Sequence, residues 1–198
     1  MKNIAFALVL ASASIAAQAQ QLAPVNQMPR QQVHGFVGFG LTAGGDKLAT
    51  AYYERGYDVS LHAGGLVAFT AGIDYTVTPE FSFQGSVGYH VDQASASNGD
   101  MRFQRFPIEV LAYYKVAPQW RVGGGARWAA SPKLRTSGAG DIGDYDFEPT
   151  VGAVVEAEYL VSPQVGVKFR YVAEKYKEKG SSYKIDGNHA GVYANLYF

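Results

Sequence analysis

The side chains that could perform chemistry in this chain are few and scattered. Histidine occurs four times, at His34, His62, His90 and His189, and cysteine is absent from the sequence. A nucleophile needs a base within hydrogen-bond reach, and Ser60 and His62 would share one face of an extended segment. That segment lies in a long polar connection, so we interpret the pair as ordinary loop residues. The sequence therefore predicts no catalytic residues.

A group of carboxylates and a run of glycines are the candidate ligand sites. The oxygen atoms of Asp141, Asp144, Asp146 and Glu148 could hold Ca²⁺. Their spacing is not that of an EF-hand, so a solvated acidic loop is the better interpretation. The glycines at 123–125 are not followed by the Lys-Ser/Thr pair of a phosphate-binding loop. The lack of cysteine excludes thiolate zinc sites and disulfides, and we predict neither a metal site nor a cofactor.

Length and charge limit the class of protein. The chain has 198 residues, which is enough for one domain with a sizeable core. Its 17 basic and 17 acidic residues cancel, whereas a nucleic-acid-binding surface shows a clustered basic excess. We therefore expect no nucleic-acid partner.

Residues 1–19 have the organisation of a secretory signal peptide. Lys2 supplies the positive start, an apolar stretch follows, and Ala17-Gln18-Ala19 supplies small residues for cleavage. The apolar stretch is shorter than the roughly 20 residues that a membrane-spanning helix needs. We expect the mature chain to begin at Gln20, with residues 20–32 as a flexible N-terminal segment. No later window holds 18 consecutive apolar residues, so a membrane crossing would have to use strands.

From residue 33 onward, apolar residues recur at every second position, which is the period of a β-strand. One turn motif occurs three times, around Pro79, Pro118 and Pro163, each with Tyr four residues and Val two residues before the proline. Proline cannot donate a hydrogen bond to a β-ladder, so it belongs at the end of a hairpin. The repeat therefore predicts three tight turns, each joining two strands.

The expected fold is all-β, an eight-stranded antiparallel up-and-down transmembrane β-barrel over residues 33–198. The predicted strands are 33–42, 66–77, 80–91, 104–116, 119–130, 149–161, 164–175 and 189–198. The predicted long connections are 43–65, 92–103, 131–148 and 176–188. All short turns would then lie at one end of the barrel and all long connections at the other, which is the layout of membrane barrels.

The two faces of these strands differ sharply. One parity, which includes Phe69, Val110 and Val155, carries no charge. The other parity mixes glycines with eight charged residues: Asp74, Glu109, Arg121, Arg127, Glu156, Glu158, Lys168 and Arg170. A soluble lipid-carrying barrel would show the same alternation with its apolar face inside, so alternation alone does not give the direction.

Three observations place the charged parity inside. Glycines among long side chains suit the narrow lumen of eight strands. Aromatic residues such as Tyr75 and Trp120 flank the short turns, where an interfacial belt would lie. The last strand ends at Phe198, in phase with Val192 and Leu196. A charge facing lipid at mid-bilayer costs about 2–4 kcal/mol, whereas paired charges are tolerated in a lumen.

We therefore predict a structural network of ion pairs inside the barrel. Glu109, Glu156 and Glu158 should bridge to the four cations of the same parity, which are Arg121, Arg127, Lys168 and Arg170.

Together the signal peptide, the amphipathic strands and the terminal Phe198 resemble the small OmpA- and OmpX-type barrels, within the class of porin-like outer-membrane β-barrel domain proteins. The resemblance covers essentially all of residues 33–198. It implies export to the periplasm and insertion in the outer membrane. It also implies a C-terminal signal strand, with Val192, Leu196 and Phe198, that contacts the barrel-assembly machinery. No peptidoglycan-binding domain follows the barrel, so anchoring to the cell wall is not expected.

Such motifs specify fold and location far better than activity. Our first hypothesis is a monomeric, non-enzymatic barrel with a structural or loop-mediated interaction role, whose filled lumen is not that of a general porin. The alternatives are a lipid-modifying enzyme similar to lipid A deacylases, or a narrow ion channel. Outer-membrane lipids and lipopolysaccharide are the expected partners. Lysines of the fourth connection could contact lipopolysaccharide phosphates, but a mixed-charge loop that keeps this connection soluble is the favoured interpretation. These lysines are Lys175, Lys177, Lys179 and Lys184.

Overall fold

The computed structural model describes residues 32–198 except 53–57, 97–98, 139–140 and 142. The predicted signal peptide at 1–19 and nearly all of the segment 20–32 lie outside the described residues. None of the described residues forms a helix long and apolar enough to cross a membrane.

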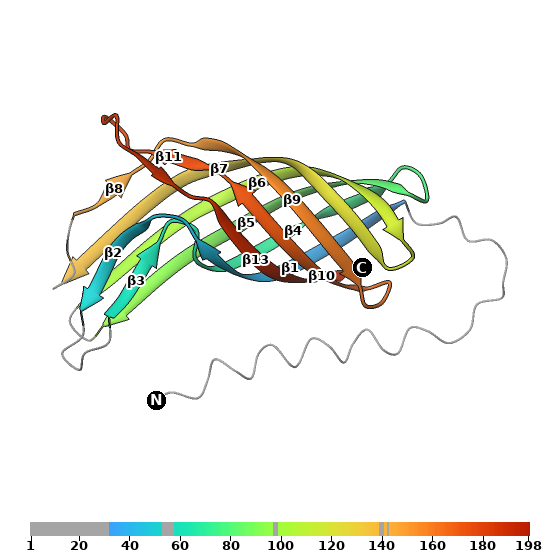
Figure 1. The fold of residues 1–198 in the computed structure, drawn as a ribbon, viewed down its shortest axis with the longest axis horizontal. Coiled ribbons are helices and arrows are strands. Elements are labelled where there is room, and N and C mark those ends of the chain that lie inside the picture. The colour runs from blue at the N-terminus through green and yellow to red at the C-terminus, as the bar shows by residue number, and fades with distance from the viewer. Residues whose placement is uncertain (1–31, 53–57, 97–98, 139–140, 142) are drawn as a thin grey trace. The chain divides into compact units, whose positions relative to one another are not determined.

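Eight antiparallel strands form a closed ring (Figure 1). They are β1 (Val33–Gly44), β4 (Leu66–Thr76), β5 (Phe81–Ala96), β6 (Gly99–Ala117), β7 (Trp120–Gly138), β9 (Thr150–Leu160), β10 (Val165–Ala173) and β13 (His189–Tyr197). Each of the eight pairs with its neighbour in the chain, and β1 pairs with β13 to close the ring. The predicted all-β barrel is therefore confirmed.

The three proline motifs lie in the short turns β4–β5, β6–β7 and β9–β10. In the first, the Val77 amide donates to the Phe81 carbonyl at 2.9 Å, and the Thr78 hydroxyl accepts from the Phe81 amide at 3.1 Å. The third turn repeats this pattern with Val161 and Ser162. The hydroxyl side chain one residue before Pro79 and Pro163 thus closes each of these two turns, with the proline outside the ladder.

The expected long connections were wrong in detail, because much of their length is strand. β5 and β6 stay paired through 92–103 as far as Ala96 and Gly99, and β7 continues to Gly138. Short pairs fill the other connections: β2 (Lys47–Tyr52) with β3 (Asp58–His62), β8 (Tyr145–Asp146) with β7, and β11 (Lys175–Lys177) with β12 (Lys184–Asp186). The outward-facing residues of these strands become polar where the strands extend beyond the apolar band. The polar sequence was therefore interpreted as loop although the backbone is still strand.

A β-bulge at Ser131 changes the direction of the side chains of β7. Ser131 has φ 47°, and the β6–β7 register shifts between Gln104 and Phe106. Before the bulge Trp128 points outward, and beyond it Leu134 is buried. A bulge inserts one extra residue and so reverses the parity that faces inward.

The apolar parity faces outward. Phe69, Val110 and Val155 are 51%, 62% and 56% exposed on the isolated barrel, so they do not line a central cavity. Val192, Leu196 and Phe198 point the same way on the last strand. This direction excludes a soluble lipid carrier and matches a barrel surrounded by hydrocarbon.

Glycines make room for aromatic rings inside the ring of strands. A Cβ added at Gly40 would lie 2.3 Å from the Tyr193 ring, and one at Gly123 would lie 2.5 Å from the Tyr113 ring. Gly40 stands directly opposite Tyr193 where β1 and β13 close the barrel. The glycines in the charged parity therefore provide the space that a narrow lumen needs for long side chains.

We predict that Gly40→Val destabilises the barrel by roughly 1–3 kcal/mol, the usual range for overpacking, because the new side chain collides with Tyr193. Gly85→Val is the matched control, since a Cβ at Gly85 would meet nothing within 4 Å. Urea unfolding in lipid vesicles measures both variants. Equal midpoints for the two would contradict this account of the seam.

Candidate functional site: the lumen and the cap

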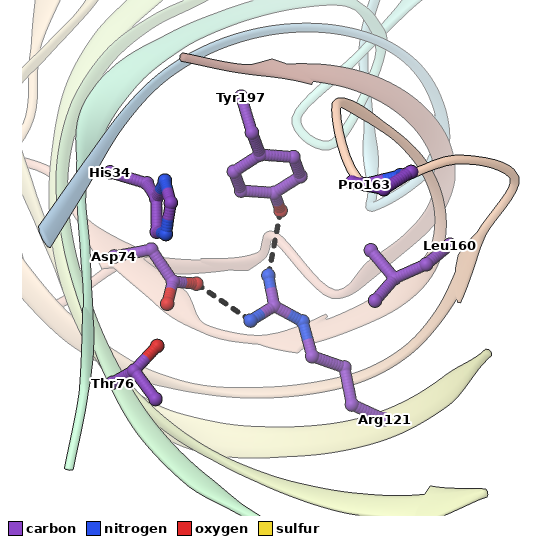
Figure 2. Close-up of a pocket in the computed structure, with 7 residues that line it drawn as sticks. All are labelled: His34, Asp74, Thr76, Arg121, Leu160, Pro163 and Tyr197. Atoms are coloured by element: carbon purple, nitrogen blue, oxygen red, sulfur yellow. Dashed lines mark hydrogen bonds and ion pairs between the residues drawn. The ribbon is translucent and has the colours of Figure 1, made fainter. Parts of the chain in front are cut away.

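The lumen is filled by layers of charged and aromatic side chains, and the first layer lies near the proline turns. Arg121 donates from Nε to Glu158 at 2.6 Å, from Nη1 to Asp74 at 2.7 Å and from Nη2 to the Tyr197 hydroxyl at 2.8 Å. Figure 2 shows the guanidinium between Asp74 and Tyr197, with His34 beside Asp74. Pro163 also lines this small cavity of about 120 Å³. One arginine on β7 thus joins β4, β9 and β13.

The second layer is centred on Lys168. Its Nζ donates to Gln84 Oε1 at 2.6 Å and to the Tyr113 hydroxyl at 2.8 Å, and lies 3.4 Å from Glu156 Oε2. Lys168 is fully enclosed. A buried ammonium is costly to desolvate unless its three protons find acceptors, and these contacts supply them.

The third layer is a buried chain of carboxylates and guanidinium groups. Glu109 accepts from Arg127 at 3.0 Å and from Arg170 at 2.7 Å. Arg170 also donates to Glu156 at 2.7 Å, which links this layer to Lys168. The structure therefore brings all eight predicted lumen residues together, in pairs that cross between strands.

A fourth layer was missed by the sequence analysis. Arg105, His90, His189 and Glu174 are all buried. Glu174 accepts from Arg127 Nε at 3.1 Å and from the Tyr176 hydroxyl. The signal was present, because Arg105 and Glu174 share the parity of Glu109 and Arg170 within the predicted strands. Both lie close to the ends of the predicted strands, and neither was included in the predicted lumen network.

Aromatic rings cover most of the lumen cations. Arg121 lies 4.4 Å from the Tyr113 ring centre, Arg170 lies 4.8 Å from Tyr193, and Arg105 lies 5.1 Å from Phe103. Desolvated cation–π contacts contribute about 2 kcal/mol each. The rings thus fill space between charges and also stabilise them.

Beyond the fourth layer, the long connections share a hydrophobic cluster that we call the cap. Its buried residues are Leu61, Ala63, Met101, Phe103, Ala129, Leu134, Phe147, Tyr176 and Ile185. Phe103 makes edge contacts with Phe147 at 5.7 Å and with Tyr176 at 5.5 Å between ring centres. The sequence analysis did not predict the cap, because its members are spread singly through polar stretches.

The residues weighed for catalysis do not form a site. His62 and Ser60 lie in β3, and the described contacts include none between a histidine ring and a serine hydroxyl. His90 does lie 2.8 Å from the Thr42 hydroxyl, but both residues are buried within the lumen. A lipid substrate has no access to that pair.

The acidic third connection is held by an arginine. Arg135 pairs with Asp146 at 2.6 Å and with Asp144 at 3.6 Å, and Asp141 accepts from the Thr136 hydroxyl at 3.0 Å. Within the described ranges there is no group of three or more acidic or histidine side chains placed to hold a metal ion.

We predict that Glu109→Gln destabilises the barrel by about 3–5 kcal/mol, the usual effect of removing one partner of a buried ion pair, because Arg127 and Arg170 lose their shared carboxylate. Glu148→Gln is the control, since Glu148 pairs with Lys177 in the open and exposed pairs contribute only about 0–1 kcal/mol. The denaturant midpoints for unfolding of the two variants in lipid vesicles test this prediction. A Glu109 variant as stable as the control would refute a structural role for this network.

We also predict an acid-sensitive contact in the third connection. The hydrogen bond from Arg135 lowers the pKa of Asp146 below its ordinary value of 3.8. The contact is therefore fully present above that value and is lost as the pH falls through the lowered pKa. Side-chain carbon NMR of Asp146 should report this titration, and Arg135→Gln should raise the pKa. If Asp146 titrates in the Arg135→Gln variant as it does in the wild type, the hydrogen bond from Arg135 is not the cause of the lowered pKa.

Comparisons with known proteins agree with the fold. Similar solved structures include the attachment invasion locus protein Ail of Yersinia pestis (12% identity, TM-score 0.53, 84% of this chain and 97% of that one), Neisserial surface protein A (11%, 0.51, 84% and 97%) and OprH of Pseudomonas aeruginosa (15%, 0.51, 83% and 99%). At such identities these structures show the fold alone.

No curated protein matches the sequence significantly. The family model described as "Outer membrane protein beta-barrel domain" matches residues 5–198. The chain therefore belongs to the outer membrane protein β-barrel domain family, and its barrel lies in the outer membrane.

Proposed function

We propose that this protein is a non-enzymatic, closed barrel that presents a firmly held extracellular surface for recognition. The cap carries the proposal, because all the long connections contribute to it or are bonded to its members. A connection that only needs to be soluble would not share a hydrophobic core with its neighbours. The cap over a filled lumen also argues against a general porin, whose open channel needs many more strands.

Hydrogen bonds between connections support the same role. The Asp46 amide donates to the Asp186 carbonyl at 2.7 Å, and the Glu148 amide donates to the Lys177 carbonyl at 2.8 Å. The His62 amide donates to Asp92 at 2.8 Å. These bonds join the first connection to the fourth, the third to the fourth and the first to the second. A surface fixed in this way loses little conformational entropy on binding a partner.

The lysines of the fourth connection are one part of that surface. Lys175 and Lys184 are exposed, and Lys177 stands directly opposite Lys184 in the β11–β12 pair. Like charges on facing positions repel, and Glu148, which lies 3.0 Å from Lys177, offsets part of this repulsion. An anionic group beside the exposed Lys184 would offset more of it. The Ail structure has also been determined in complex with the heparin analogue sucrose octasulfate. Phosphates of lipopolysaccharide are the partner that we propose for these lysines.

The remaining parts of the proposal concern assembly. We propose that the protein is exported, loses residues 1–19, and enters the membrane as a monomer. The barrel-assembly machinery would contact the outward side chains Val192, Leu196 and Phe198 of the last strand.

We predict that the mature protein in planar bilayers shows no stable open channel. We expect the four lumen layers and the cap to block any continuous water path for ions. A general porin reconstituted in the same bilayer is the control. A steady ohmic conductance comparable to that of the porin would overturn the closed-barrel proposal in favour of a channel.

A further inference from the structure

We infer that a groove on the outer wall of the extended strands β5, β6 and β7 binds an acidic sugar unit, one that carries a carboxylate or a phosphate. This inference rests on the proposed recognition role and assigns it a site and a ligand class. The groove has a volume of about 350 Å³ and is separate from the lysines of the fourth connection. It is lined by Gln93, Asp100, Arg102, Arg135, Thr136, Ser137 and Asp144.

Strand register places these side chains in two adjacent rows. Gln93, Arg102 and Arg135 face one another across β5, β6 and β7. In the next row Asp100 lies between Ser95 and Ser137. Arg102 and Asp100 are two residues apart on β6, so they point to the same side. Both are exposed, and the row of amide, guanidinium and carboxylate groups forms one continuous polar wall.

The two arginines of the groove differ in what they already bind. Arg135 donates to Asp146 and to the Leu134 and Tyr145 carbonyls, and its Nε lies 3.6 Å from Asp144. Arg102 forms no side-chain hydrogen bond or ion pair with the described residues, and the same holds for Asp100. A free guanidinium directly opposite another arginine is unfavourable unless an anion lies between them.

Arg102 and Asp100 specify the ligand chemistry together with Gln93, whose amide already donates one hydrogen bond to the Ser95 hydroxyl at 2.9 Å. A guanidinium binds a carboxylate or phosphate through two parallel hydrogen bonds. A carboxylate such as that of Asp100 accepts hydrogen bonds, and the Gln93 amide both donates and accepts, as sugar hydroxyls require. A simple phosphate ion would use Arg102 but would be repelled by Asp100. A neutral sugar would use Asp100 and Gln93 but would leave Arg102 unpaired.

The position of the groove suits a sugar rather than an acyl chain. Phe106 and Trp128 point outward and mark the last large apolar side chains on β6 and β7 before the groove. Arg102 lies four residues beyond Phe106, which is about 13 Å along a strand. We therefore infer that Arg102 lies outside the hydrocarbon, near the carbohydrate attached to outer-leaflet lipids. The acidic sugar could belong to that lipid or to a free polysaccharide.

The test uses the mature protein in nanodiscs and three probes: trigalacturonate, neutral maltotriose and purified lipopolysaccharide. We expect trigalacturonate or lipopolysaccharide to bind, maltotriose to bind far more weakly, and Arg102→Gln to lower the affinity at least about tenfold, as expected for loss of a charge-assisted pair. Asp100→Asn should lower it several-fold. The double variant Lys177→Gln and Lys184→Gln is the control for trigalacturonate, whose binding it should leave unchanged, whereas it should lower only that part of lipopolysaccharide binding that does not depend on Arg102. Binding of trigalacturonate alone indicates a free polysaccharide, and binding of lipopolysaccharide alone that is weakened by Arg102→Gln indicates the lipid.

Because Arg102 is exposed and unpaired, its variant should fold, and the shift of the folded band on unheated gels checks this. The inference is overturned if folded Arg102→Gln binds like the wild type, or if maltotriose binds as well as trigalacturonate. Loss of binding in the double lysine variant but not in Arg102→Gln would move recognition to the β11–β12 pair. In that case the proposed function stands and the groove fails. Failure of the proposed function itself would show as channel conductance.

Discussion

The hydrocarbon around the barrel is the constraint on which the rest of the structure depends. It excludes charge from the outer face, so the polar side chains of eight strands must be satisfied inside a lumen that has little room for water. Ion pairs in such a place are stable when each proton and lone pair has a partner. Arg121 and Glu109 meet this condition by contacting partners on several strands at once, and the charges therefore hold the ring together.

The narrow lumen also explains why glycine and aromatic residues occur together. A tyrosine ring that crosses the interior needs an opposite strand without a side chain, and Gly40 and Gly123 provide this for Tyr193 and Tyr113. The same rings lie against Arg170 and Arg121. The two tyrosine rings thus both fill space and stabilise charges. The contact between Gly40 and Tyr193 lies at the seam between the first and last strands.

Outside the membrane the strands face water, so polar side chains are favoured on the outer face and apolar side chains on the inner face. Beyond the Ser131 bulge the strands bury Leu134 and Phe103 and turn polar groups such as Arg102 outward, as in a water-soluble sheet. The result is a barrel with two cores of opposite character, an ionic one in the membrane and an apolar one above it. The apolar core holds the connections in place and leaves a polar wall on the outside.

The sequence by itself determined the strand number, the short turns and which parity is charged, because period-two alternation and proline are local signals. It also indicated which charges could meet, since all eight share one parity. Only the tertiary structure decided the partner of each charge, because the pairs join strands far apart in the chain. The cap and the groove were also decided by the tertiary structure. Phe103 and Tyr176 meet although they belong to two different connections, and Arg102 lies opposite Arg135 because the bulge sets the β6–β7 register. No local pattern encodes contacts of that kind.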